Sequence, residues 1–426
     1  MELLDLTSKA TATGPLCDAC LGRLVADRSF GLTNTERGRS LRITHALKAD
    51  EPYSDPTDDE RCWVCEGESD RIETFAQRAI ATLEGWEFES YQVGTRVPPL
   101  LTENDELLRE DVGLATDAGA PLKRELNREV GKRIGEETET DVDLDRPDVQ
   151  VLIDLATDEV EVRIHSAFVY GRYRKEARDV PQTKWPCSDC AQTGLHRGET
   201  CEACDGTGYR YGTSVEQQTA PIVQQAMDGS GAVFHGAGRE DVDALMLGTG
   251  RPFVIEIEEP RRRTVDLEAI EIQINDEAPA ASVSDLSLAT HEMVERVKRL
   301  DASKTYRMAV TFAEPVSAEA LATALEELNG STITQRTPER VDHRRADIDR
   351  TRTVYDIEGE LTDETHASIE LHGEGGLYVK ELVSGDDGRT EPSLAGLLGV
   401  ESTVSTLDVL AVEGESEPFA DPAFLR

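Results

Sequence analysis

The sequence predicts a multidomain α+β protein, and three observations support this fold class. The chain has 426 residues, which is long enough for two to four domains with a core each. Its eight cysteines all fall in CxxC pairs, which are typical of structural zinc modules. The remaining chain mixes segments of helical apolar spacing with alternating, strand-like segments. Strands dominate the second half, so we expect a largely antiparallel mixed sheet flanked by helices there.

The first expected domain, residues 1–66, is an N-terminal zinc module, and residues 179–212 form a second CxxC insert. Two residues between thiolates let both bind one ion, and four thiolates complete a tetrahedral structural site. About forty residues separate the first two pairs, so pairing between the modules stays open. Glycines around the second set are also similar to the CxxCxGxG repeats of a chaperone zinc domain. The expected ligands are Cys17, Cys20, Cys62 and Cys65, then Cys187, Cys190, Cys201 and Cys204.

Residues 67–178 predict a small α/β domain. Helices are expected over 71–84 and 121–134, a strand over 90–98, and a hairpin over 149–164. Directly after the hairpin, aromatic and basic side chains are interleaved, which suits phosphates and unstacked bases of RNA. We therefore expect RNA contacts from Arg172, Arg174 and Lys175.

Residues 213–426 form the last expected domain, and its centre is Asp241 in the segment Gly-Ala-Gly-Arg-Glu-Asp. Apolar strands AVF and FVIEIE flank this glycine-rich loop. A carboxylate there can act as nucleophile or base, and Arg239 is close enough in sequence to help keep it ionised. The alternative is an ordinary turn or N-cap residue. Further strands are expected over 268–275, 304–312, 351–358, 366–372 and 404–412, and helices over 291–300 and 317–328.

The composition is strongly acidic, with 85 Asp+Glu against 45 Lys+Arg and a formal net charge of −40. The charge is spread through the chain, which is typical of adaptation to high salt. An acidic protein that avoids nucleic acid is the alternative. At about 1 M salt, however, the Debye length is only about 3 Å, so global repulsion from RNA is screened. RNA recognition would then depend on shape, stacking and local basic patches.

The N-terminal sequence MELLDLTSKATATG lacks the basic start and apolar core of a signal peptide. No apolar run approaches the ~20 residues of a membrane helix. We therefore expect a cytoplasmic protein with no membrane partner, in which the cysteines bind metal rather than form disulfides.

Several stretches resemble the archaeal tRNA pseudouridine synthases of the Pus-ten family, over nearly the whole chain. They are RPDVQVLIDLATDEVEVRIHSAFVYGRYRK, PQTKWPC, YGTSVEQ and HGAGREDVDALMLGTGRPFVIEIEEPRRR. The resemblance implies that residues 67–178 are a THUMP-like RNA-binding domain and residues 213–426 a pseudouridine synthase domain. It also implies tRNA as the partner, rather than DNA, and uridines 54 and 55 of the T-loop as the targets.

The same resemblance assigns site residues. Lys304-Thr-Tyr306 matches the KxY pattern, in which the tyrosine stacks on the uracil. Gly376-Leu-Tyr378-Val-Lys380-Glu-Leu382 resembles the later motif, in which a basic residue pairs with Asp241 and a leucine packs beside the base. Related synthases often carry arginine where this chain has Lys380, and a lysine pair is less rigid.

The predicted chemistry needs no organic cofactor, because isomerising uridine changes no composition. Asp241 would attack the ribose, attack the base or remove a ribose proton, and the sequence leaves all three open. Contacts to tRNA phosphates are expected from Arg261, Arg262, Arg263, Arg344 and Arg345. The alternatives are a non-catalytic THUMP and zinc tRNA-binding protein or chaperone, and a THUMP-linked methyltransferase or thiouridylase. The last class needs nucleotide-binding loops that the sequence lacks. The sequence leaves the oligomeric state open.

Overall fold

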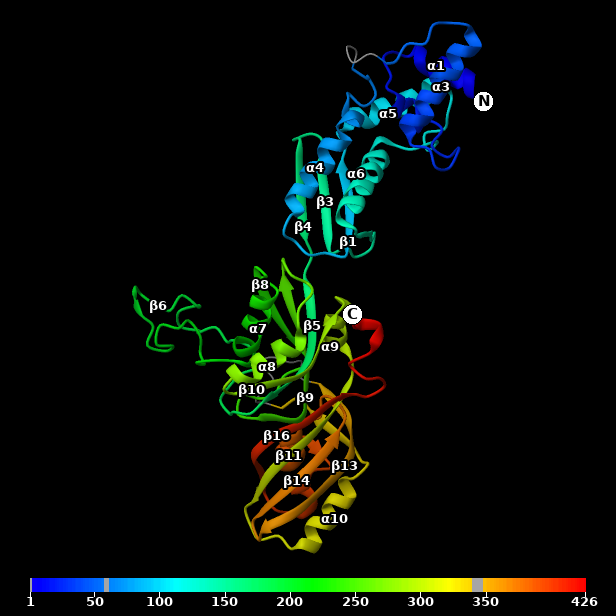
Figure 1. Cartoon of the computed structure of the whole chain (residues 1–426). Helices are drawn as coiled ribbons and strands as arrows, with labels where there is room; N and C mark the ends of the chain where they lie inside the picture. The colour runs from blue at the N-terminus through cyan, green and yellow to red at the C-terminus, as the bar shows by residue number, and fades with distance from the viewer. Residues whose placement is uncertain (1, 57–60, 339–347) are drawn as a thin grey trace. The chain divides into compact units, whose positions relative to one another are not determined.

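The structure is a computed structural model, and it describes residues 2–56, 61–338 and 348–426 (Figure 1). It divides into two units, residues 1–165 and residues 166–426. Among the described residues, no helix is both long and apolar enough to cross a membrane.

The first unit joins a helical segment to an α/β domain. Its elements are α1 (Leu3–Ala12), α2 (Asp18–Arg23), α3 (Asn34–Ala49), η1 (Glu68–Arg71), α4 (Ile72–Leu83), β1 (Ser90–Arg96), α5 (Pro99–Val112), α6 (Leu122–Thr138), β2 (Asp141–Val142), β3 (Val149–Asp154) and β4 (Glu159–Ile164). The sheet order is β2-β1-β3-β4, with β1 parallel to β2 and β3. Helices α4 and α6 pack on each other and on the sheet, and Phe75, Leu126 and Val151 are fully buried between them.

The second unit is built on a long mixed sheet. Its strands are β5 (Ala167–Lys175), β8 (Gly231–Gly236), β9 (Leu245–Glu258), β10 (Ala281–Ala289), β11 (Ala302–Phe312), β12 (Thr332–Arg336), β13 (Asp349–Asp363), β14 (His366–Gly373), β15 (Thr390–Glu391) and β16 (Ser402–Gly414), with the small hairpin β6 (Leu195–His196) and β7 (Glu199–Thr200) apart from it. The order is β10-β5-β9-β16-β11-β14-β13-β12-β15, and β8 pairs with β9. Within this sheet, as far as the structure describes it, only the pairing of β9 with β16 is parallel, so the largely antiparallel mixed sheet is confirmed.

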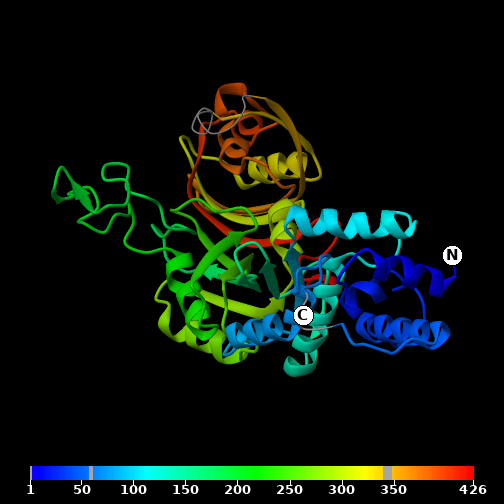
Figure 2. The same ribbon diagram turned by 90° about the horizontal axis from the view of Figure 1, so that it is seen from above.

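Helices cover this sheet in two groups. They are α7 (Val215–Ala226), α8 (Leu267–Glu277), α9 (Glu292–Arg299), α10 (Ala318–Leu328), α11 (Val379–Ser384) and α12 (Leu394–Leu398), with short turns η3 (Asp386–Gly388) and η4 (Pro422–Phe424). One core lies under α7, α8 and α9. The other lies where the strands β11 to β14 curve around α10, α11 and α12, a curvature visible in Figure 2.

Most expected elements are confirmed, including helices α4, α6, α9 and α10, the hairpin of β3 and β4, and strands β8, β9, β11, β13, β14 and β16. The strand expected over 268–275 is wrong, because these residues form helix α8. Ile270, Ile272 and Ile274 alternate as in a strand. In the helix, however, Ile270 and Ile274 share the buried face and Ile272 is 56% exposed. Asp266 caps this helix by accepting a hydrogen bond from the Ala269 amide.

Strand β5 connects the end of the first unit to the central sheet. It pairs with β9 on one side and with β10 on the other. The boundary expected at residue 178 places β5 in the THUMP-like segment, whereas in the structure β5 belongs to the second unit, which begins at residue 166. Five apolar and aromatic side chains of β5 lie in the core of the second unit, namely Ala167, Phe168, Val169, Tyr170 and Tyr173.

Candidate active site

The register of the central strands brings together residues that are far apart in the chain. The loop after β8 carries Asp241 and ends where β9 begins at Leu245. Residue Met246 of β9 is paired with Val409 of β16, and Val409 is paired with Tyr306 of β11. Tyr306 therefore lies two strands away from the end of the Asp241 loop.

A cavity of about 370 Å³ lies at this position. Three segments line it, namely the loop after β8, the neighbouring strands, and the turn that leads into α11. The lining residues are Arg239, Glu240, Asp241, Ala244, Arg251, Lys304, Tyr306, Gly376, Leu377, Tyr378, Val379, Lys380, Leu407 and Val409. The structure thus places Asp241, Tyr306 and Lys380 in one cavity, as the sequence motifs imply.

Lys380 forms an ion pair with Asp241. Its Nζ lies 3.2 Å from Asp241 Oδ2, and the two side chains are 29% and 48% exposed. The same Nζ lies 3.7 Å from Oδ2 of Asp243, which is 70% exposed. Lys380 is in the first turn of α11, so the glycine turn before this helix sets its position. Gly376 has φ +88° there, a conformation that favours glycine.

Tyr306 reaches the cavity from a largely buried position. Burial raises the pKa of its hydroxyl to about 12. This value includes the positive charge of Arg251, which lowers the pKa, and the negative charge of Asp241, which raises it. The phenol is therefore neutral at physiological pH, and its ring is an apolar wall beside the carboxylate.

Buried charged groups fix the loop that carries Asp241. Lys175 is fully buried, and its Nζ donates to the carbonyls of Asp241 (3.2 Å) and Val242 (3.0 Å). Arg251 Nε lies 2.9 Å from Glu240 Oε2, and both side chains are at most 1% exposed. The Tyr173 hydroxyl donates to the same Glu240 oxygen at 2.8 Å. Glu240 is thus anchored through its side chain, and Asp241 is anchored through its backbone carbonyl. These buried contacts fix the position of the Asp241 carboxylate.

The three expected RNA contacts on β5 differ in outcome. Lys175 is 0% exposed and is committed to the loop carbonyls, so it cannot contact RNA. The Arg172 side chain is only 13% exposed and donates to the carbonyls of Thr249, Gly250 and Val412. Arg174 is half-buried and donates to the Gly248 carbonyl at 2.7 Å. Lys175 is therefore wrong as an RNA contact, Arg172 is largely taken up by backbone carbonyls and Glu413, and the contact from Arg174 stays a prediction.

Other predicted site residues have mixed outcomes. Leu382 is 1% exposed in the core and does not line the cavity, where Leu377 and Leu407 are the lining leucines instead. Among the three arginines after β9, Arg263 is buried, and Arg261 and Arg262 are exposed outside the cavity lining. Arg344 and Arg345 lie outside the described residues.

Tyr378 lines the cavity, and its backbone is held by Gln335. The Tyr378 amide donates to Gln335 Oε1 at 2.9 Å, and Gln335 Nε2 donates back to the Tyr378 carbonyl at 2.9 Å. This reciprocal pair fixes the backbone at the start of α11, two residues before Lys380.

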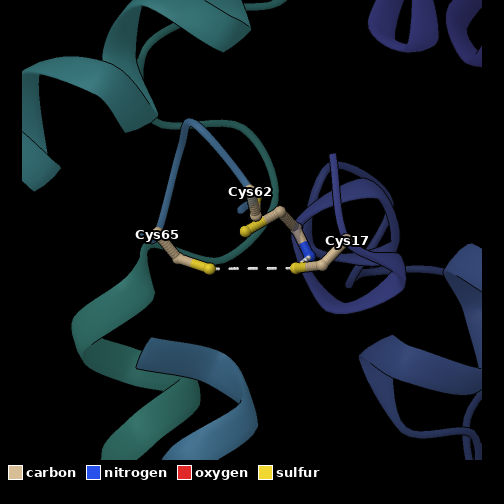
Figure 3. Close-up of side chains that lie close together, drawn as sticks. Cys17, Cys62 and Cys65 are labelled. Carbon is tan, nitrogen blue, oxygen red and sulfur yellow. Dashed lines mark hydrogen bonds between the residues drawn. The ribbon is translucent and has the colours of Figure 1, made fainter. Parts of the chain in front are cut away.

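The cysteines gather in two separate groups, which answers the open question of their pairing. Within each group the four sulfurs lie within 4.8 Å of one another. Cys17 Sγ lies 3.8 Å from Cys65 Sγ, and Figure 3 shows the thiols of Cys17, Cys62 and Cys65 converging on one point. In the second group, Cys187 and Cys201 are 3.9 Å apart and Cys190 and Cys204 are 3.7 Å apart. Four ligands about 2.3 Å from a tetrahedral zinc ion are about 3.8 Å from one another, so both groups fit this ion.

The sequence interpretation missed two members of the site, Arg251 and Glu240. Arg251 stands at the start of the strand segment RPFVIEIE, and Glu240 precedes Asp241, so neither residue stands out as a site residue in the sequence. The only signal in the sequence is a single arginine next to a mainly apolar strand segment, with acidic residues in the loop that precedes this strand. Such a pair is recognised only when the pairing of β8 with β9 is known.

Comparison with known proteins adds independent findings. A family model described as "Pus10, C-terminal" matches residues 168–413, and one described as "Pus10 THUMP domain, archaeal" matches residues 75–154. A protein of Halorubrum lacusprofundi named "tRNA pseudouridine synthase Pus10" is 60% identical over 427 residues, covering 100% of both chains. Proteins of the same name from Methanothrix thermoacetophila and Methanopyrus kandleri are 43% and 39% identical. The matches cover 97% and 96% of this chain, and 95% and 98% of the relatives.

Proposed function

The chain belongs to the archaeal Pus10 family of tRNA pseudouridine synthases, and on that basis we propose that it isomerises uridines 54 and 55 in the T-loop of tRNA, with Asp241 as the catalytic carboxylate. The single observation that carries the proposal is the shared cavity. Asp241, Tyr306 and Lys380 come from three distant segments and line one space of about 370 Å³.

The cavity has the size and lining that a flipped-out nucleotide needs. Ligand pockets of about 300–1,000 Å³ are common, and an enzyme that acts on a base extrudes it from its stack. The neutral Tyr306 ring supplies a face on which the uracil stacks. Leu377, Leu407 and Val409 supply further apolar contacts. These surfaces favour an uncharged base and leave the ribose near the carboxylate.

The reaction breaks the bond between ribose C1′ and N1 of the base and forms a bond between C1′ and C5. The C5 proton is lost and N1 gains a proton, so atoms and charge balance. Asp241 acts at the junction of sugar and base, by attack on either one or by removing a ribose proton. Lys380 Nζ lies 3.2 Å from Asp241 Oδ2, and this ion pair holds the carboxylate in place. The buried Lys175 and Glu240 contacts keep the loop fixed while the base rotates.

The two cysteine groups are proposed as zinc sites with a structural role. Each offers four thiolates and leaves no ligand position for water, so zinc there stabilises the fold and performs no chemistry. In the first group, the Arg23 guanidinium donates to Cys20 Sγ at 3.0 Å and to Asp105 Oδ1 at 2.6 Å. This arginine ties the metal site to helix α5.

The target positions are tested with tRNA transcripts that carry tritium at uridine C5. Incubation in concentrated salt without added cofactor releases tritium in proportion to the uridines converted. We expect release from the parent transcript, partial release when cytidine replaces uridine 54 or uridine 55 singly, and none when both are replaced. Undiminished release from the double replacement would contradict the T-loop assignment. No release from any tRNA by folded protein would favour the non-catalytic alternative.

A further inference from the structure

A cluster of aromatic and basic side chains lies beside the cavity, where the chain enters and leaves the second cysteine group. Trp185 precedes Cys187, and Tyr211 follows Cys204. Their rings meet edge to face with centroids 5.5 Å apart. The Arg210 amide donates to the Trp185 carbonyl at 2.9 Å, so the two segments run side by side.

Two guanidinium groups approach the same indole ring. The Arg239 Cζ lies 5.8 Å from the centre of the Trp185 ring, and the Arg210 Cζ lies 5.9 Å from it. Arg210 is also 5.6 Å from the Tyr211 ring. Arg239 lines the active-site cavity as well, so one side chain connects this surface to the catalytic space. We refer to Trp185, Tyr211, Arg210 and Arg239 as the Trp185 cluster.

Among the residues that the structure describes, no ion pair neutralises the charges of Arg210 and Arg239 in the Trp185 cluster. The side chains of Arg210 and Arg239 are exposed, and neither forms an ion pair or hydrogen bond with any residue that the structure describes. The chain has 85 acidic residues against 45 basic ones, so carboxylates are abundant on its surface. Two exposed arginines that lie near aromatic rings and have no carboxylate partner among the described residues are therefore suited to an external anion.

We propose that the Trp185 cluster binds the nucleotide next to the target uridine in the RNA substrate. Its unpaired base stacks on Trp185 and Tyr211, and its phosphate is bound by Arg210 and Arg239. Base stacking on aromatic rings and phosphate binding by arginine are the two contacts by which proteins hold single-stranded RNA. The proposal rests on the proposed function, because it requires a uridine in the cavity beside Arg239.

Adaptation to salt gives this arrangement a physical reason. At about 1 M salt the Debye length is about 3 Å, so long-range attraction of RNA by surface charge is lost. Stacking does not depend on long-range charge, and an arginine in direct contact with a phosphate is within the screening length. An acidic protein in concentrated salt can therefore still hold a nucleotide on such a surface.

The first test compares affinities for a tRNA transcript in W185A, W185F and the matched control Y355A. Tyr355 is 40% exposed in the same unit and packs on His372, so its removal controls for the loss of an exposed ring pair. We expect W185A to weaken binding about 5- to 150-fold, the range for loss of one base stack. W185F should retain most of the affinity, and Y355A should match the wild type. Bound zinc and thermal midpoint are measured to show that W185A keeps its fold.

The second test locates the nucleotide. Transcripts carry an abasic residue on one or the other side of the target uridine, and binding is measured with wild type and W185A. If Trp185 stacks on the base beside the target uridine, one of the two abasic transcripts should bind the wild type more weakly than the parent transcript does. W185A should bind that abasic transcript and the parent transcript equally well, because the stacking contact is already lost. If the losses of affinity from W185A and from the abasic residue are additive for both transcripts, the proposal is refuted.

A third variant does not depend on the aromatic rings. R210A removes an exposed side chain that forms no ion pair with the residues that the structure describes, so folding should be unaffected. The slope of log affinity against log salt concentration should become shallower by the amount of about one phosphate contact. W185A and R210A that both bind as the wild type would refute the Trp185 cluster. In that case, tritium release by the wild type would still support the enzyme, whereas absent release would refute the proposed function itself.

Discussion

Glu240 is the residue whose replacement tests the support of the active-site loop most sharply. Its carboxylate is 0% exposed and pairs with Arg251 at 2.9 Å, and Lys175 Nζ lies 3.9 Å away. E240Q keeps the shape but leaves two buried cations without a counter-charge. Removing one partner of a buried pair costs about 3–5 kcal/mol. At about 2–4 °C per kcal/mol, the melting temperature of the second unit should fall by about 6–20 °C.

The pH dependence of this loss follows from Lys175. Burial lowers the pKa of Lys175, and the charge of Glu240 partly opposes that shift. The folded protein therefore releases this proton at lower pH than the unfolded chain, in which lysine titrates near about 10.4. Removing the Glu240 charge lowers the pKa of Lys175 further, so Lys175 loses its unpaired charge at lower pH in E240Q than in the wild type. The difference in stability between E240Q and the wild type should therefore shrink as the pH rises toward the pKa of an unfolded lysine.

The assay is thermal unfolding in concentrated salt across a pH series, with E295Q as the matched control. Glu295 pairs with Arg299 on one helix at 2.9 Å, but the side chains are 56% and 79% exposed. An exposed helical pair contributes only about 0.3–0.5 kcal/mol, so E295Q should melt close to the wild type. Equal melting temperatures for E240Q and E295Q would refute the claim that a buried ion pair anchors the loop.

Two further predictions concern the cavity and the metal sites. Because the pKa of Tyr306 is raised to about 12, its contribution to stability is present below about pH 10 and is lost as pH rises toward about 12. At about pH 10 Tyr306 should still be un-ionised, so the wild type and Y306F should show equal phenolate absorbance. D241N removes a nearby negative charge and should lower the pKa of Tyr306. A larger phenolate signal in the wild type than in Y306F at that pH would contradict the burial of Tyr306. In the metal sites, C20S and C190S should each reduce bound zinc from two ions per chain to one, measured by metal analysis, because each removes a ligand from a different group. Loss of both ions from either single variant would contradict two independent sites.

The sequence predicted those parts of the site that are local in the chain. The segment from Gly236 to Asp241 between two apolar strands is read directly from glycines and strand patterns, and the structure has this loop between β8 and β9. The joint position of Tyr306 and Lys380 was implied by family motifs only. Its physical cause is the pairing of β9, β16 and β11, which no local pattern encodes.

The wrong expectations share one cause, which is that composition does not show orientation. The isoleucines at 270, 272 and 274 fit the spacing of a strand as well as that of a helix. The helix forms because Asp266 caps it and because it buries Ile270 and Ile274 on one face. Arg172 and Lys175 are basic in sequence, yet a strand with neighbours on both sides leaves their side chains among backbone carbonyls. Trp185 was missed for the opposite reason, because its partner Tyr211 is brought near only by closure of the cysteine group.

The most direct measurement of the central claim compares D241N with D243N. Both carboxylates lie near Lys380 Nζ, at 3.2 Å and 3.7 Å, and both replacements remove one charge while keeping the shape. Single-turnover tritium release from tRNA should fall by about 10²- to 10⁴-fold or more in D241N, with tRNA still bound. In D243N, the rate should stay within about twofold of the wild type, as for an exposed substitution. Equal rates in the two variants, or undiminished release by D241N, would contradict the assignment of Asp241 as the catalytic carboxylate.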